Sequence, residues 1–155
     1  MKTLRYPLLL ALALSLAAPA ALSAQDETAA PGPGTGDAVV DARLADIDIY
    51  AARYPQAFVD ELVRYFDAPR PLMEELLDKG RHAPGDLYYA CALARVSGRP
   101  CRGVLEARDA AAEGEDWQAV AARLGVQPGG PRATRLRDGM ADSYARWARA
   151  LPTAD

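Results

Sequence analysis

The spacing of apolar residues from Asp37 onward limits this chain to a helical fold. Apolar side chains recur there every three or four residues, which places them along one face of an α-helix. Prolines and glycines interrupt the pattern and mark where helices begin and end. No hairpin signal or β-rich run is present. The sequence therefore predicts an all-α domain over residues 37–152, a compact orthogonal bundle of six or seven short helices.

Each predicted helix is defined by an apolar stripe or by its breaking residues. The clearest stripes are Val40, Leu44, Ile47, Ala51 and Tyr54; Phe58, Leu62, Tyr65 and Phe66; Leu72, Met73, Leu76 and Leu77; and Leu136, Met140, Tyr144, Trp147 and Leu151. The last stripe predicts a helix over 132–150. Between the third and fourth stripes, prolines, glycines and an acidic helix start predict helices over 85–96, 100–112 and 116–124.

Residues 1–24 are typical of a secretory signal peptide. Basic residues precede an apolar run from Leu8 to Ala18, and small residues follow it. The run has about 11 residues, well short of the roughly 20 that a bilayer-spanning helix needs. We expect cleavage after Ala24, with cleavage after Ala20 as the alternative. A retained N-terminal anchor is the lesser interpretation.

Export would leave a small, acidic protein. Lys2 and Arg5 are lost with the signal, so 16 Lys and Arg remain against 21 Asp and Glu, a net charge of −5. Such a protein is not built as a general binder of polyanions. Residues 25–36 carry repeated Pro and Gly with no aromatic or branched aliphatic side chain, which predicts a disordered tether. We expect a periplasmic or secreted protein with no stable membrane span after cleavage.

Cys91 and Cys101 are the only cysteines, and in an oxidising compartment two cysteines usually pair. Cys91 lies within one predicted helix and Cys101 in the first turn of the next, so a helix hairpin would bring them together. Their unequal distances from the loop amount to an axial offset of ~5 Å, which the helix crossing angle must absorb. We expect a disulfide; the alternative is two buried thiols.

Residues 117–137 invite a second interpretation, because they read much like a DNA-binding helix-turn-helix. Arg132, Arg135 and Arg137 would then line one exposed face and contact phosphates and base edges. The export signal, the negative mature charge and the stiff Pro-Gly-Gly-Pro turn at 128–131 argue against this. We therefore expect a plain helix-packing unit and no nucleic-acid partner.

Two segments resemble a family of small, uncharacterised exported α-helical bacterial proteins. One is the motif W-x-x-V-A-x-x-L-G-V-x-P-G, which starts at Trp117, and the other is GDLYYACALA at 85–94. The resemblance covers most of 46–147 and implies only a helical exported domain. Relatives tend to carry Ser, Phe and His after the Pro-Gly, so the role of that His does not transfer here. The residues of this chain at those places are Gly130, Ala133 and Thr134.

Residue types suited to catalysis are few and scattered. His82 is the only histidine and is expected to be an exposed loop residue, so we predict no metal site and no cofactor. Ser97 and Ser143 lack a nucleophile-elbow motif. Acidic pairs occur at 60–61, 74–75 and 115–116, but helix neighbours point about 100° apart and do not converge on one substrate atom. We predict no catalytic residue.

Aromatic and arginine side chains are the remaining candidates for binding. Tyr88 and Tyr89 cannot share one helix face, so we expect one of them to be exposed or to lie in a groove. Arg146 and Arg149 flank Trp147, which fits a small anionic or peptide docking patch; cation–π packing within the fold is the alternative. The possible partner-binding residues are Tyr88, Tyr89, Trp117, Trp147, Arg146 and Arg149.

These observations favour an exported accessory or interaction protein of the cell envelope that has no catalytic activity. Its partner would be an unknown envelope protein or polymer, and it should expose an apolar or aromatic patch. The alternative is an envelope enzyme acting on cell-wall or sugar polymers, with Glu61, Glu74 or Glu75 as the acid. That alternative predicts a cleft in which two of these carboxylates, or one with His82, lie within about 10 Å.

Overall fold

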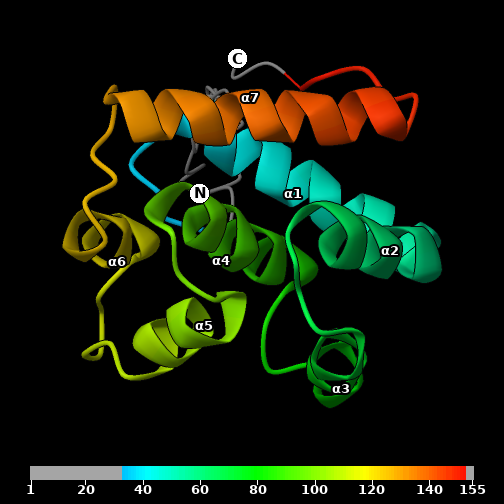
Figure 1. Ribbon diagram of the computed structural model, residues 1–155, viewed down its shortest axis with the longest axis horizontal. Coiled ribbons are helices and arrows are strands. Elements are labelled where there is room, and N and C mark those ends of the chain that lie inside the picture. The colour runs from blue at the N-terminus through cyan, green and yellow to red at the C-terminus, as the bar shows by residue number, and fades with distance from the viewer. Residues whose placement is uncertain (1–32, 153–155) are drawn as a thin grey trace, which may run out of the picture.

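The computed structural model describes residues 33–152, and this part of the chain is all-α (Figure 1). The predicted signal peptide, its cleavage site and most of the predicted tether lie outside the described residues. None of the described helices is long and apolar enough to span a membrane. The helices are α1 (Ala38–Arg53), α2 (Pro55–Tyr65), α3 (Arg70–Lys79), α4 (Pro84–Ser97), α5 (Cys101–Asp109), α6 (Trp117–Arg123) and α7 (Pro131–Arg146).

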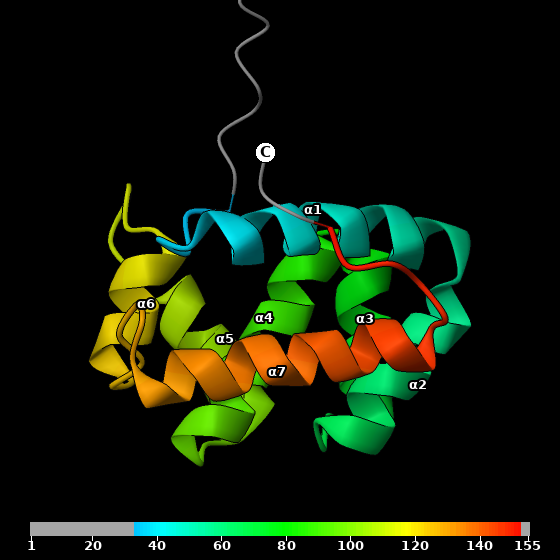
Figure 2. The same ribbon diagram turned by 90° about the horizontal axis from the view of Figure 1, so that it is seen from above.

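Helix α4 forms the centre of the bundle. It packs against α1, α5 and α7, and α1 and α7 run side by side along one side of the molecule (Figure 2). Every residue from Leu87 to Ala94 is buried, because these neighbours cover α4 on all sides. Tyr88 and Tyr89 are 0% and 4% exposed, so the expectation that one of them reaches the surface is wrong.

Close approach of α4 to α1 depends on a residue without a side chain. A Cβ atom added at Gly85 would lie 2.8 Å from the carbonyl oxygen of Leu44, closer than two such atoms can pack. The Gly85 amide also donates to Asp48 Oδ1 of α1 at 2.7 Å. Ala83, the residue before α4, offers no capping side chain, so Asp48 caps this helix from a neighbouring element.

Helix ends follow the signals that the sequence predicts. Proline occupies the first turn of α2, α3, α4 and α7. Gly80 and Gly98 end α3 and α4 in the left-handed conformation, with φ of 60° and 71°. Asp37 and Asp116 cap α1 and α6 by accepting hydrogen bonds from backbone amides of the first turn. The prediction of six or seven short helices is confirmed, with seven in the part of the chain that the structure describes.

The last helix ends four residues earlier than predicted. Helix α7 stops at Arg146, and Ala148 adopts a left-handed conformation with φ of 52° that turns the chain back. This turn lets the Trp147 ring stack on Tyr50, with ring centroids 4.3 Å apart. Leu151, expected to continue the apolar stripe, is instead 40% exposed.

Other differences from the predicted stripes occur at helix junctions. Tyr54 and Tyr65 are 45% and 41% exposed, although both were expected on buried faces. Tyr54 is the residue between α1 and α2, and Tyr65 is the last residue of α2, so neither lies over the core. Helix α5 also ends at Asp109, three residues before the predicted end.

The expected pairing of Cys91 and Cys101 is confirmed, because their sulfur atoms lie at disulfide distance. The Cα atoms are 4.5 Å apart, and both residues are buried. Cys91 lies in the middle of α4 and Cys101 begins α5, so the bond fastens α5 across the central helix. The crossing of these two helices absorbs the axial offset (Figure 1).

The final residues of the predicted tether pack against the bundle. Thr35 is buried, and its hydroxyl donates to Asp41 Oδ1 at 2.6 Å. The Gly34 carbonyl accepts a hydrogen bond of 2.8 Å from the Gln118 amide at the start of α6. Disorder predicted up to residue 36 is therefore wrong for residues 33–36, because their backbone and hydroxyl groups find partners on α1 and α6.

Candidate functional site

Glu61, a candidate acid in the enzyme interpretation, is buried beneath Arg146. Its carboxylate accepts hydrogen bonds from Arg146 Nε at 3.0 and 3.2 Å and from Ser143 Oγ at 2.6 Å, and it also pairs with Arg146 Nη2. The Tyr88 hydroxyl lies 2.7 Å from Ser143 Oγ. This cluster links α2, α4 and α7, and we call it the Glu61 clamp. Its carboxylate is saturated with partners and is therefore not free to act as an acid.

Two residues of the clamp, Arg146 and Tyr88, have raised pKa values. The hydrogen bond from Arg146 to Glu61 raises the pKa of the Arg146 guanidinium. Burial raises the pKa of the Tyr88 hydroxyl. Ser143 is fully buried, so its hydroxyl cannot meet a substrate in the folded protein. The clamp is thus a structural ion pair, with its arginine charged and its tyrosine neutral.

The predicted docking patch around Trp147 is occupied by contacts within the fold. Arg146 lies over the Tyr65 ring, with Cζ 3.8 Å from the ring centroid. Arg149 pairs with Asp46 and lies over Tyr50 at 5.4 Å. Both arginines therefore have an anionic partner and an aromatic partner inside the molecule, which is the packing alternative.

Trp117 is also unavailable at the surface. It is 1% exposed, its indole Nε1 donates to Asp86, and the Tyr89 ring packs edge-on at a centroid distance of 5.3 Å. Of the six possible partner-binding residues, three are in the core. The others, Trp147, Arg146 and Arg149, are near the surface but are engaged as described above.

The remaining catalytic candidates do not converge. Glu74 and Glu75 lie on the exposed side of α3 and pair with Arg70 and Lys79 of the same helix. The His82 side chain is only 9% exposed and lies 3.3 Å from Asp109, so its expected exposure is wrong. It is buried because α5 covers the connection that carries it. Within residues 33–152, no cluster of His, Cys, Asp or Glu is arranged to hold a metal ion.

The three arginines of the helix-turn-helix interpretation are divided between two sides of α7. Arg132 and Arg135 are exposed, whereas Arg137 is half-buried and pairs with Asp37, with Nε 3.2 Å from Oδ2. The single basic face that this interpretation predicts is therefore not formed. Arg132 also donates to the carbonyls of Leu124 and Gly125 at 3.3 Å, which satisfies the end of α6.

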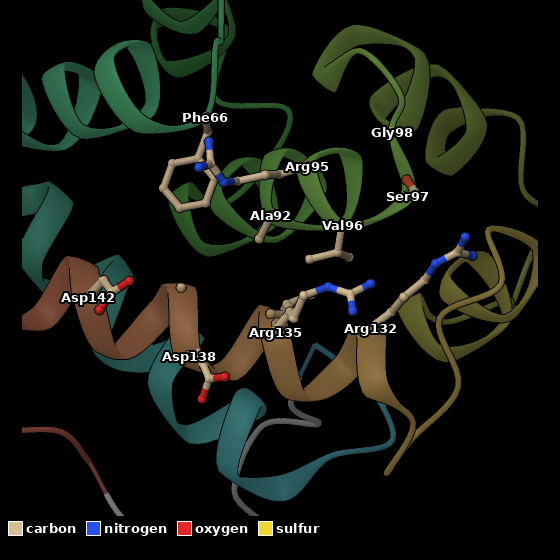
Figure 3. Close-up of a pocket in the computed structure, with 12 residues that line it drawn as sticks. Phe66, Ala92, Arg95, Val96, Ser97, Gly98, Arg132, Arg135, Asp138 and Asp142 are labelled. Atoms are coloured by element: carbon tan, nitrogen blue, oxygen red, sulfur yellow. The ribbon is translucent and has the colours of Figure 1, made fainter.

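An open groove lies between the C-terminal half of α4 and the length of α7 (Figure 3). Its volume is about 620 Å³. The floor is apolar, and Phe66, Ala92 and Leu136 there belong to the core. The rim is charged, and its side chains are Arg95, Arg132, Arg135, Asp138 and Asp142. We call this feature the α4–α7 groove; an apolar floor with a charged rim is the usual form of a ligand or peptide site.

Charge is separated along the α7 side of the groove. Arg132 and Arg135 lie near the N-terminal end of the helix, and Asp138 and Asp142 lie further along it, with Asp138 pointing away from α4 in this view (Figure 3). Arg135, Asp138 and Asp142 make no ion pair or side-chain hydrogen bond with any residue that the structure describes. Arg95, on the α4 side, donates to the Tyr65 carbonyl and lies beside Phe66. Three of the α7 charges, those of Arg135, Asp138 and Asp142, are thus available to a ligand.

Sequence reasoning missed the groove, although one signal pointed to it. Arg95 is the only basic residue of α4 and follows directly on the buried run that ends at Ala94, so it marks where this helix leaves the core. The chain matches no protein-family model, no curated protein and no solved structure. The floor and the charged rim of the α4–α7 groove are therefore the basis for identifying the candidate site.

Proposed function

We propose that this is an exported, non-catalytic interaction protein of the cell envelope that binds its partner in the α4–α7 groove. The observation that carries the proposal is the groove itself, because it joins an apolar floor to three rim charges, Arg135, Asp138 and Asp142, that have no ion-pair or side-chain hydrogen-bond partner among the described residues. The tyrosine, tryptophan and arginine candidates elsewhere contribute to packing and ion pairs. The groove offers charged side chains that a ligand can pair with, but it does not bring together a general acid and a general base. This arrangement favours ligand binding over catalysis.

Export is the second part of the proposal. The leader at residues 1–24, with its short apolar run, supports it. The paired Cys91 and Cys101 support it as well, because such bonds persist mainly in oxidising compartments.

A photo-crosslinking experiment in intact cells tests both parts. A photoreactive amino acid replaces Arg135 in the full chain, and after irradiation the mass of the cross-linked species and its cellular fraction are measured. We expect a discrete adduct of the processed protein in the envelope or secreted fraction, because a partner seated in the groove lies against this position.

Two control positions define the specificity of the adduct. Arg102 is exposed on α5 outside the groove, and Arg149 lies beside Trp147. An adduct from position 102 as strong as that from position 135 would contradict binding in the groove. A stronger adduct from position 149 than from position 135 would place the partner at the aromatic patch, the surface formed by Tyr50, Tyr54 and Trp147. Cross-linking of an unprocessed chain inside the cell would contradict export.

A further inference from the structure

The charge pattern of the α4–α7 groove identifies the class of partner, an inference that rests on the proposed function. We infer that the groove binds an extended peptide segment of a partner protein with acidic residues at one end, apolar residues in the middle and basic residues at the other end. Arg132 and Arg135 would bind the acidic end, and Asp138 and Asp142 the basic end. Phe66, Ala92 and Leu136 form the floor beneath the middle.

The dimensions of the groove suit a short segment. From Arg132 to Asp142 the axis of α7 rises by about 15 Å, at ~1.5 Å per residue. An extended chain advances ~3.3 Å per residue, so about five residues span the charged face. Alternate side chains of such a segment point to opposite sides, so the first and third of three consecutive apolar residues can both point to the floor.

The order of the charges argues against a uniform polyanion such as a nucleic acid or an anionic wall polymer. A strand of evenly spaced phosphates that satisfied Arg132 and Arg135 would continue past Asp138 and Asp142, where like charges repel it. A peptide avoids this repulsion because its own charge can change sign over the same distance. Arg and carboxylate also form directional, charge-assisted hydrogen bonds.

Each end of the groove can be tested separately, because each end has a charged side chain that makes no contact needed for folding. Arg135 and Asp142 make no ion pair or side-chain hydrogen bond with the described residues, so Arg135→Gln and Asp142→Asn should leave the fold intact. Arg132 is less suitable because it also donates to the end of α6. Arg102→Gln, on exposed α5, is the matched control.

The experiment measures the Kd of three synthetic peptides for the mature, disulfide-bonded protein by NMR titration at low salt. The first carries two glutamates, three apolar residues and two lysines. In the second, glutamines replace the glutamates, and in the third, glutamines replace the lysines. We expect Arg135→Gln to weaken the first and third peptides about fivefold, the value of one exposed ion pair, and to leave the second unchanged.

Asp142→Asn should show the mirror pattern, weakening the first and second peptides about fivefold and leaving or strengthening the third. Such a crossed pattern reports pairwise coupling between one protein charge and one peptide charge. The inference is overturned if a fourth peptide with glutamates at both ends binds tighter than the first, if Arg102→Gln weakens binding as much as Arg135→Gln, or if no peptide binds. Should the cross-link at Arg135 form while every peptide fails, only the partner class is wrong.

Discussion

Replacing Arg146 with alanine is expected to cost about 3–5 kcal/mol of unfolding free energy, as much as truncating a large core side chain. The substitution leaves the Glu61 carboxylate, 4% exposed, buried without its cation. Charge burial of this kind costs more than the ion pair itself contributes, because water no longer solvates the carboxylate. Since domains of this size have only about 5–15 kcal/mol of stability, Arg146→Ala should unfold at a much lower urea concentration.

Urea unfolding followed by circular dichroism measures this loss, and two further variants isolate its cause. Arg64→Ala removes an exposed arginine of α2 whose nearest carboxylate oxygen is 4.0 Å away, so it should change stability by less than about 1 kcal/mol. The double variant Glu61→Gln with Arg146→Met removes both charges and should recover most of the loss. A double variant as unstable as Arg146→Ala would show that the cost does not come from the unpaired carboxylate.

Removing the disulfide is expected to have an effect of similar size. The bond closes a loop with a sequence separation of 10 between Cys91 and Cys101. Releasing a loop of this length in the unfolded chain costs about 3 kcal/mol of stability in the chain-entropy account. The double variant Cys91→Ala with Cys101→Ala should therefore show a lower thermal midpoint, by roughly 10 °C at a few degrees per kcal/mol.

Reductant supplies the control for this prediction. Thermal unfolding of the wild-type protein in reductant should match that of the double variant without reductant, and the double variant itself should not respond to reductant. Mass measurement after alkylation should add no label to the oxidised wild-type protein. Two labelled thiols in protein isolated from the envelope, or a thermal midpoint unchanged by reduction, would contradict a stabilising disulfide.

The fold could be predicted from the sequence because its helices are bounded by local signals. Prolines in first turns, left-handed glycines such as Gly80 and Gly98, and the acidic caps Asp37 and Asp116 act within a few residues of where they occur. The pairing of Cys91 with Cys101 could be predicted from the expected oxidising compartment and from their places on two consecutive helices. The end of α7 could not be predicted, because the turn at Ala148 serves a contact between Trp147 and Tyr50, far apart in the sequence.

The candidate site could not be predicted for the same reason, since its residues meet only in the folded bundle. Arg146 and Arg149 flank an aromatic residue and look free in the sequence, but Glu61 and Asp46, their partners, are 85 and 103 residues away. Helix geometry predicts that one of Tyr88 and Tyr89 is exposed or lies in a groove, but it says nothing about how many neighbours surround a helix. The groove, in turn, joins Arg95 of α4 to a face of α7 that no local pattern identifies.

The central claim is that the partner binds in the α4–α7 groove rather than at the aromatic patch around Trp147. An NMR spectrum of the isotope-labelled mature protein, recorded before and after addition of solubilised cell-envelope fraction, tests it most directly. Binding in the groove should shift or broaden the amide signals of Phe66 and of residues 92–98 and 132–142, and no others. Changes centred on Tyr50, Trp147 and Arg149, with the groove amides unmoved, would contradict it.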